Sequence, residues 1–435
     1  MPKGYARYVL TVMVGINFLN YLDRFILPVA ASQVKEEFHL TDAQLGGLAT
    51  AFLLVYALAA VPFGIWADRG VRTAVIGTGV AIWSLATLFT GFARNYLQLF
   101  ITRAVLGIGE ASYYPAGTSM LADYFPKASR ARAMSIWGAG TAAGIAVGFS
   151  LGGLVASRLG WRAAFYMTAV PGLVLAWLAF RLREPVRGAA EAHRPAGERK
   201  SSLTLRNVVG LLSIPTLRAT ILAETVLFFV LAGAANWLPI FLNRRFGLGV
   251  GGAGTLAGGV LVLGGLAGTL LGGWLGDWRS RRVGTGGNLQ VGILGFLLGS
   301  VFVTAALLAP SLASFTPFFF LGVISLYLYS GPYTAIKQNV VVPGLRASAV
   351  MVALLVEHLF GDSFSPLAIG KLSDTVHSLP LALLLLLPPF LLLAALVAAT
   401  GLRSAERDAR VMEERWAGGQ AGSRSMDHGL VTEEI

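Results

Sequence analysis

The feature that most constrains this chain is a set of long stretches without any charged side chain. They are Thr73–Ala93, Ala133–Ser157, Ala163–Phe180, Gly284–Leu345 (interrupted by Lys337) and Leu379–Leu402. A helix needs about 20 apolar residues to cross about 30 Å of hydrocarbon, and these stretches meet or approach that length. The sequence therefore predicts an all-α polytopic membrane protein.

Composition supports this class and excludes others. Only 13% of the residues are charged, whereas a soluble domain has about 25%. The absence of cysteine excludes disulfides and thiolate metal sites. The net charge of +12 resembles that of nucleic-acid-binding proteins. However, Lys and Arg lie between the hydrophobic stretches, where they set topology and contact anionic membrane lipids, so we expect no nucleic-acid partner.

The chain divides into two halves. We expect about twelve transmembrane helices in two six-helix bundles, at 1–182 and 217–402, with a linker at 183–216 and a disordered tail at 403–435. The apolar run after Arg7 is too long for a signal peptide and is predicted to be the first membrane helix. Both halves carry a related loop after their second helix, which indicates an internal repeat of the kind found in transporters.

Charges in the loops predict the orientation. One set of alternate loops is richer in Lys and Arg, and it includes both chain ends and the linker. By the positive-inside rule, both termini are expected in the cytoplasm.

Charged and amide side chains lie inside two of the predicted helices of the first half. Asp23 and Arg24 lie in the first, and Arg103 and Glu110 lie in the fourth. A charge at the centre of a spanning helix costs roughly 2.5–3.5 kcal/mol unless it is paired or hydrated. We therefore predict that these four residues form a substrate and proton-coupling site. The alternative is that they are ion pairs that only hold helices together.

Other polar and aromatic side chains are candidates to line the same cavity. On a 3.6-residue period, several of them share a face with the charged residues or lie on facing helices of the second half. These candidates are Asn17, Asn20, Tyr21, Tyr113, Tyr114, Asn236, Trp237, Tyr329, Tyr333, His358 and Asp362. The three second-half tyrosine and histidine positions also have a simpler interpretation, as packing residues.

Two motifs resemble those of the major facilitator superfamily. The first is the loop Gly64-x-x-x-Asp68-Arg69-x-x-Arg72, with a partial copy at Gly273 that contains Asp277 and Arg279. The second is Arg103-x-x-x-Gly107-x-Gly109-Glu110. The resemblance implies a cytoplasmic gate at the first motif. A glycine at every fourth residue from Gly140 to Gly152 predicts close packing of the fifth helix against another helix.

Within the superfamily, further blocks resemble the spinster family. They are Asn20-Tyr21-Leu22-Asp23-Arg24, Gly109-Glu110-Ala111-Ser112-Tyr113, Ala122-Asp123-Tyr124-Phe125, Arg183-Glu184-Pro185, Val341-Val342-Pro343, His358-Leu359-Phe360-Gly361-Asp362 and Gly370-x-x-Ser373-Asp374. The resemblance implies transport of single-chain lipids such as lysophospholipids or sphingoid phosphates, with protons. Glu224 and Lys337 are not recognisable marks of the family.

The hypothesis from the sequence is a proton-coupled transporter that works by alternating access. A protonated Glu110 or Asp23 would release an Arg to hold an anionic head group. The first-half motifs also occur in symporters of sugar acids and other organic anions, which remain the alternative. We expect no enzyme activity, cofactor or metal, because the chain has five His and no recognisable catalytic set. A monomer in the plasma (inner) membrane is expected.

Overall fold

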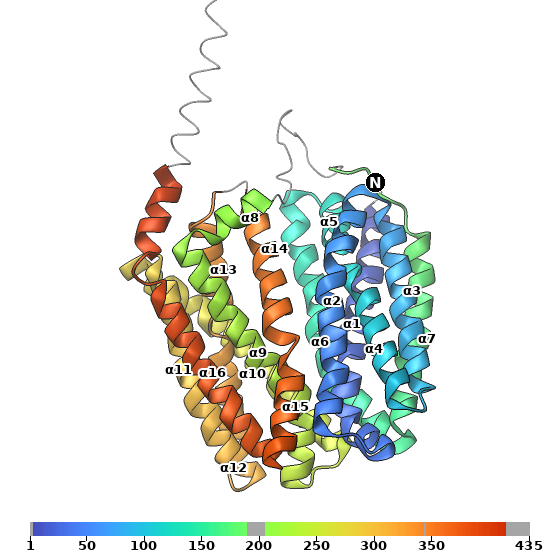
Figure 1. Ribbon diagram of the computed structural model, residues 1–435. Coiled ribbons are helices and arrows are strands. Elements are labelled where there is room, and N and C mark those ends of the chain that lie inside the picture. Colours follow the sequence, from blue (N-terminus) through green and yellow to red (C-terminus); the bar gives the residue numbers. More distant parts are fainter. Residues whose placement is uncertain (1–2, 189–204, 343–344, 415–435) are drawn as a thin grey trace, which may run out of the picture.

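The computed structural model describes residues 3–188, 205–342 and 345–414, and these residues form a bundle of long, roughly parallel helices (Figure 1). Eleven helices in these ranges are long and apolar enough to cross a membrane. The predicted fourth span, Tyr96–Ala122, is instead divided between two shorter helices. The parts of the linker and tail at 189–204 and 415–435, and Pro343 of the family blocks, lie outside the described residues.

The helices follow the predicted division of the chain. The first half contains α1 (Lys3–Phe38), α2 (Asp42–Arg69), α3 (Arg72–Gly91), α4 (Tyr96–Ala111), α5 (Tyr113–Tyr124), α6 (Lys127–Leu159) and α7 (Trp161–Arg181). The second half contains α9 (Pro215–Phe246), α10 (Val250–Val283), α11 (Gly286–Leu308), α12 (Leu312–Tyr327), α13 (Ser330–Asn339), α14 (Arg346–Val356), the π-helix η2 (Glu357–Asp362), α15 (Ser365–Val376) and α16 (Leu379–Thr400). The short helix α8 (Leu205–Leu212) lies between the halves in sequence.

The start of α1, α8 and the helical residues 405–414 lie at one end of the bundle, which we call the proximal end (Figure 1). The opposite end, where α2 begins and α9 ends, is the distal end. Residues 405–414 were expected to be disordered, but they are helical, and Asp408 in this segment binds the backbone N–H and hydroxyl of Thr216 at 3.0 and 2.7 Å. The assignment of the proximal end to the cytoplasm stays a prediction.

Three spans are interrupted, and a proline explains the place of each interruption. A proline ring clashes with the carbonyl group four residues earlier and provides no N–H for a helical hydrogen bond. Pro115, Pro332 and Pro366 lie four residues after Ala111, Leu328 and Asp362, where α4, α12 and η2 end or nearly end. The interrupted helices carry Glu110, Lys337 and Glu357, so charged side chains lie beside irregular backbone, as in many transporters.

Glycines bring helices into close contact, as the sequence predicted for the fifth span. Gly140, Gly144 and Gly148 of α6 pack on the backbone of α1, and a Cβ at Gly148 would lie 2.7 Å from the carbonyl oxygen of Leu22. Further along the same helix, Gly153 meets Val250 of α10 in the other half. One face of α6 therefore packs within its own half and then contacts the second half.

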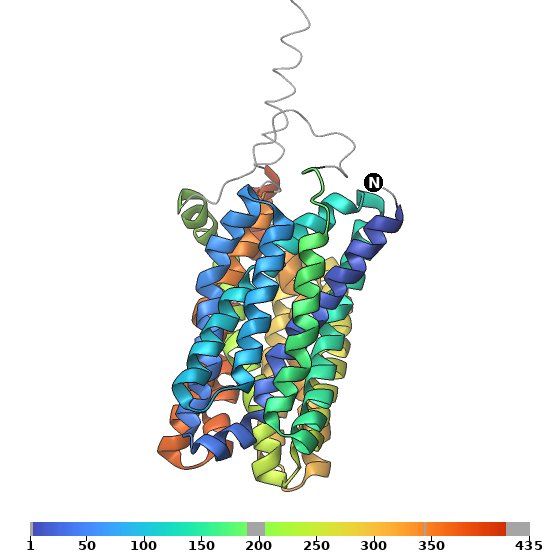
Figure 2. The ribbon, with the colours of Figure 1, turned by 90° about the vertical axis from the view of Figure 1, so that its right-hand side faces the viewer.

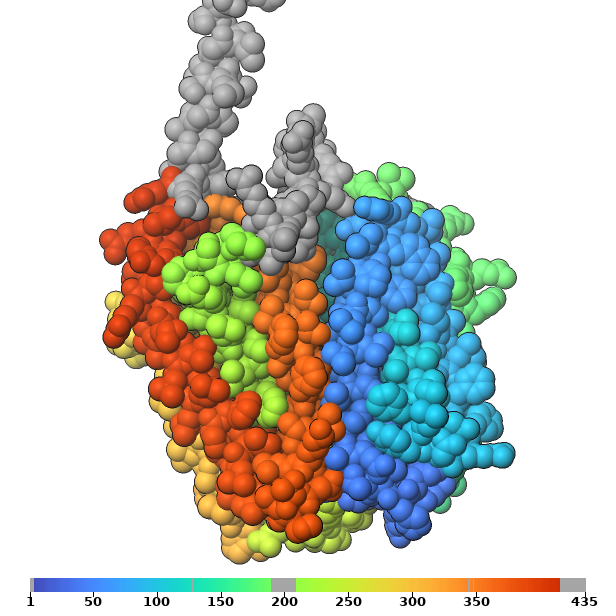
Figure 3. Space-filling model, viewed as in Figure 1, coloured from blue at the N-terminus to red at the C-terminus, as the bar shows by residue number. Residues whose placement is uncertain are grey.

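The two halves meet most closely towards the distal end. There α6 packs on α10, α2 on α15, and α1 on α9. Figure 2 shows the slender, parallel arrangement of the helices from the side, and Figure 3 shows α2 running directly beside the segment from α14 to α15. Gly46 packs against the backbone of Pro366, and Gly370 against that of Asp42, so little space separates the halves at this end.

We predict that Gly148→Ala lowers the free energy of unfolding by about 1–3 kcal/mol, because the new Cβ must displace the α1 backbone. The measurement is thermal unfolding of the purified protein in detergent, followed by tryptophan fluorescence. Gly138→Ala on the same helix is the matched control, since a Cβ there meets nothing within 4 Å. Equal melting temperatures for the two variants would contradict this account of α6 packing.

Candidate functional site

Glu110 and Arg24 form a buried ion pair between α4 and α1. Arg24 donates from Nη2 and Nε to the same oxygen, Oε2 of Glu110, at 2.7 and 3.1 Å. The other carboxylate oxygen, Oε1, is buried and has no hydrogen-bond partner among the described residues. The Arg24 side chain is 18% exposed, whereas that of Glu110 is 0% exposed. Arg24 is therefore the member of the pair that solvent or a ligand can reach.

Aromatic rings surround the Arg24 guanidinium. The ring centroids of Tyr21, Phe52 and Tyr56 each lie 5.0–5.1 Å from its Cζ atom. Such cation–π contacts stabilise a partly desolvated cation by about 0.5–2 kcal/mol each. They keep the cation in place even when its ion-pair partner changes.

Asp23 faces into the first half, away from its neighbour Arg24. It accepts hydrogen bonds from Thr87 of α3 and, at 3.1 Å, from Thr168 of α7. Its side chain is almost fully buried. Two hydroxyl groups therefore satisfy this carboxylate, where the sequence hypothesis expected an arginine.

Arg103 is a buried cation without a matching partner. Its Nε and Nη1 atoms make no hydrogen bond with any part of the chain that the structure describes. Its guanidinium lies 5.2 Å from the ring centroid of Phe52, and Asp23 and Glu110 are its nearest opposite charges. A buried, unpaired guanidinium is costly unless an anion or water satisfies it, so Arg103 marks a place for an anionic group.

The structure thus brings together Asp23, Arg24, Arg103 and Glu110, as the sequence analysis predicted. The cluster contains two acids and two bases, but only one ion pair joins them. This leaves one arginine without an ion-pair partner beside a pair that protonation of Glu110 would break. Chemically, the arrangement can exchange a proton for an anion.

The predicted cavity residues of the first half have different environments. Asn17 is buried and donates to the carbonyl of Trp137 and the hydroxyl of Thr141, so it joins α1 to α6. Tyr113 is also buried and donates to the carbonyl of Met13. Both are packing residues in this conformation. Asn20 is buried with an unpaired amide nitrogen, while Tyr21 is half-buried and Tyr114 is 48% exposed.

In the second half, His358 lies at the contact between the halves. Its Nδ1 is 2.6 Å from a carboxylate oxygen of Asp362, and its ring meets the edge or face of Tyr56 from α2 at a centroid distance of 5.7 Å. Tyr329 and Tyr333 pack on each other and on Phe296. The packing interpretation therefore holds for these two tyrosines in this conformation.

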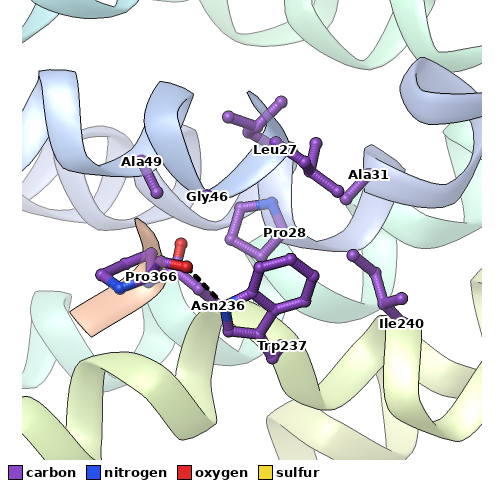
Figure 4. A pocket seen from close by; sticks show the side chains of 10 residues that line it. Leu27, Pro28, Ala31, Gly46, Ala49, Asn236, Trp237, Ile240 and Pro366 are labelled. Carbon is purple, nitrogen blue, oxygen red and sulfur yellow. Dashed lines mark hydrogen bonds between the residues drawn. The ribbon is translucent and has the colours of Figure 1, made fainter. Parts of the chain in front are cut away.

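Asn236 and Trp237 line a small void near the distal end, where residues of α1, α2, α9 and α15 converge (Figure 4). The indole of Trp237 donates to the carbonyl of Pro366 across this contact, at 3.1 Å. The void measures about 20 Å³, enough for about one water molecule. These two residues consequently seal the distal contact rather than line a substrate-sized cavity here.

At the proximal end, Arg72 is the centre of the predicted gate motif. It is fully buried and binds Asp123 at 2.5 Å, Glu184 at 2.6 Å and the carbonyl of Pro185 at 3.1 Å. These contacts join the ends of α3, α5 and α7 within the first half. Asp68, Arg69 and Asp277 are exposed, Gly64 has open space around its Cα, and Arg279 donates to Gln290.

A distal clasp between the halves was not found from the sequence. Asp42 at the start of α2 accepts two hydrogen bonds from Arg244 of α9, at 2.7 and 2.8 Å, and one from Ser373 of α15 at 2.6 Å. In return, Asp374 accepts from the backbone N–H groups of Asp42 and Ala43, at 2.9 and 2.7 Å. The signal available in the sequence was an Asp after the capping residue Thr41.

A second buried group of charges, Glu224, Lys337 and Glu357, lies in the second half. The sequence analysis noted the first two only as departures from a family pattern. Three different spans contribute these residues, so no spacing in the sequence connects them.

Comparisons with known proteins agree with this arrangement. The family model of the Major Facilitator Superfamily matches residues 13–366. Protein spinster homolog 1 of Xenopus tropicalis is 31% identical over 392 residues, which is 85% of this chain and 73% of the relative. The human homolog 1 is 31% identical over 397 residues, covering 87% of this chain and 75% of the relative.

Solved structures give the same result for the fold. The crystal structure of a bacterial homologue of the human lysosomal transporter Spinster, inward-facing and unoccupied, superposes with a TM-score of 0.81 at 26% identity, covering 95% of this chain and 99% of that one. A nucleoside transporter, NupG, shares the fold at 13% identity with a TM-score of 0.67, covering 90% and 99%.

We predict that Asp42→Asn opens the distal end. The substitution removes the charge that holds Arg244, and losing charge-assisted hydrogen bonds of about 1.5–3 kcal/mol would increase the open population about tenfold or more. The chain has no cysteine, so Ala49→Cys places a single thiol in the small void, and its rate of labelling by a water-soluble maleimide reports the opening.

Glu37→Gln in the same Ala49→Cys background is the control. Glu37 pairs with Arg162 at 2.6 Å within the first half, near the same end of the bundle. An equal labelling rate in the Asp42→Asn and Glu37→Gln proteins would show that Asp42 does not hold the halves together.

Proposed function

Because this chain belongs to the major facilitator superfamily and, within it, to the spinster family of membrane transporters, which are not enzymes, we propose that it moves single-chain amphipathic lipids with a proton by alternating access. The substrate would be of the lysophospholipid or sphingoid-phosphate type. The observation that carries the proposal is the unpaired, buried Arg103 beside the Arg24–Glu110 ion pair.

The proposed coupling uses one shared arginine. With Glu110 ionised, Arg24 is neutralised and only Arg103 lacks a partner. When Glu110 takes up a proton, Arg24 loses its ion-pair partner, and two guanidinium groups face the same region. A phosphate group accepts parallel hydrogen bonds from guanidinium groups, so an anionic head group would bind best to the protonated protein.

The role of Asp23 in this mechanism differs from the one first expected. Thr87 and Thr168 satisfy its carboxylate, so it does not need an arginine. Its negative charge instead reduces the cost of keeping Arg103 buried. We therefore propose Glu110 as the proton carrier and Asp23 as a fixed counter-charge.

Apolar surroundings support an acyl chain over a small polar solute. Arg24 is enclosed by three aromatic rings, and the central helices of the second half are mostly aliphatic. In addition, a groove of about 1120 Å³ runs along the contact of α6 and α10, lined by residues such as Leu151, Leu154 and Leu263, with Arg158 at its edge. A sugar acid would not gain from these surfaces.

The closed distal contact supports a state open toward the proximal end. The clasp at Asp42 and the void at Trp237 hold the halves together distally, and the similar bacterial structure is described as inward-facing. We propose that the halves rock about the central charges, that the clasp opens in the alternate state, and that the gate motif at Arg72 supports the opposite closure. On this proposal the monomeric protein lies in the plasma membrane with both termini in the cytoplasm.

We predict that Glu110→Gln, which mimics the protonated carboxyl, retains lipid binding but loses coupling. In proteoliposomes, the acceleration of lysolipid transport by a pH gradient should fall at least about tenfold, because the variant cannot release a proton to restore the Arg24 pair. Glu37→Gln is the matched control. A full response to the pH gradient in Glu110→Gln would contradict the coupling role.

The substrate class is tested by thermal shift of the purified wild-type protein. A ligand that binds only the folded state raises the unfolding temperature with its concentration. Lysophosphatidic acid should stabilise the protein, and Arg103→Gln should remove this stabilisation. Stabilisation by a sugar acid such as gluconate, without any by lysolipid, would favour the organic-anion alternative.

A further inference from the structure

The buried charges of the second half have an unequal balance. Lys337 of α13 donates to both carboxylate oxygens of Glu224 from α9, each at 2.8 Å. Its Nζ also lies 3.7 Å from Oε1 of Glu357, the first residue of η2. All three residues are at most 7% exposed. One ammonium group therefore serves two carboxyl groups away from water.

The two carboxyl groups also touch each other. The side chains of Glu224 and Glu357 lie within hydrogen-bonding contact. Two ionised carboxylates cannot share a hydrogen bond, because both only accept. Since Glu224 uses both of its oxygens on Lys337, the proton of this contact belongs to Glu357. A single proton between paired carboxyl groups is the arrangement that like-charge repulsion favours.

The surroundings leave further polar atoms unsatisfied. Oε1 of Glu357 and the hydroxyl of Tyr333 are both buried without a hydrogen-bond partner among the described residues. The other groups that face the site or act on it electrostatically are Tyr329, Asp362 and, next in the chain, His358, which contacts Tyr56 of α2. Apart from Lys337 and a protonated His358, none of these groups supplies a positive charge.

The backbone at this place is suited to movement. Glu357 begins a π-helix, a local widening that occurs frequently at functional sites. Lys337 lies on a short helix that follows the break before Pro332. Both residues therefore lie on interrupted spans, while Glu224 lies on the continuous helix α9. A change in either interrupted span alters how Lys337 is shared between the two carboxyl groups.

We propose that Glu224, Lys337 and Glu357 form a second proton-binding site, in which Glu357 carries the proton. When the proton leaves Glu357 for water, Lys337 moves between the two carboxylates and binds both. When a proton returns, Lys337 pairs with Glu224 alone. The site takes a proton rather than a metal cation, because the ammonium group already occupies the position between the carboxyl groups.

Infrared titration of the purified protein, without substrate, tests this site directly. The C=O stretch of a protonated carboxyl group appears only while that group holds its proton. We expect Glu357→Gln to remove one such band that titrates in the wild type, and Glu357→Asp to shift the band without removing it. Glu110→Gln, in the other half, should leave this band in place. An unchanged set of bands in Glu357→Gln would overturn the proposal and leave a static ion pair.

A flux measurement then connects the site to transport, and this step rests on the proposed function. In proteoliposomes, the ratio of protons to substrate should fall by one in Glu357→Gln relative to the wild type. An unchanged ratio would show that the second proton is not transported. The infrared result does not depend on transport, so a failure of the proposed function and a failure of this site remain distinguishable.

Discussion

The interaction on which this molecule depends is the pairing of charges that have left water. A charged side chain in a low-dielectric interior is tolerated only with a partner of opposite charge or hydrogen bonds that replace its hydration. Each half solves this differently: the first holds one ion pair and one unpaired arginine, while the second holds one ammonium group between two carboxyl groups. Neither arrangement is fully satisfied, and this incompleteness is what gives each cluster a use.

The two clusters are complementary in sign. Arg103 in the first half lacks an anion, and Glu357 in the second half lacks a cation of its own. A buried ion pair is usually no more stable than well-packed apolar residues, so stability alone does not explain either group. A transporter, however, needs groups that exchange partners at little net cost as it changes state. Partial pairing provides that.

Interrupted helices place these charges where the backbone can adjust. Pro115, Pro332 and Pro366 separate short helices from one another beside the charged residues. Meanwhile the long helices α1, α6, α9 and α10 remain continuous and carry the contact between the halves. Rigid helices with glycine faces provide the frame, and broken helices carry the groups that change partners.

The distal clasp shows how the conformation is held. Asp42 and Asp374 each bind across the boundary between the halves, one to a side chain of the opposite half and one to the start of its helix. These contacts lie at the surface end of the bundle and far along the sequence from each other. They can break without disturbing the core of either half, which is what rocking of two rigid bundles requires.

The sequence by itself determined the class of protein, the two halves and the first charged cluster. Uncharged stretches must be spans because of their length, and Asp23, Arg24, Arg103 and Glu110 must converge because isolated charges are not tolerated in hydrocarbon. The periodicity of glycine likewise predicted the packing face of α6. These inferences rest on local sequence and on one strong energetic rule.

Only the tertiary structure decided which partners the charges choose. The sequence could not assign Asp23 to two threonines, because Thr87 and Thr168 lie on other spans and resemble many other buried hydroxyl residues. It could not join Glu224, Lys337 and Glu357, or Asp42 and Arg244, for the same reason. Nor could it choose the three prolines that break a helix, since Pro28 and Pro239 lie within continuous ones. Pairing between distant spans depends on the rotation and depth of each helix, which neighbouring helices set and no local pattern encodes.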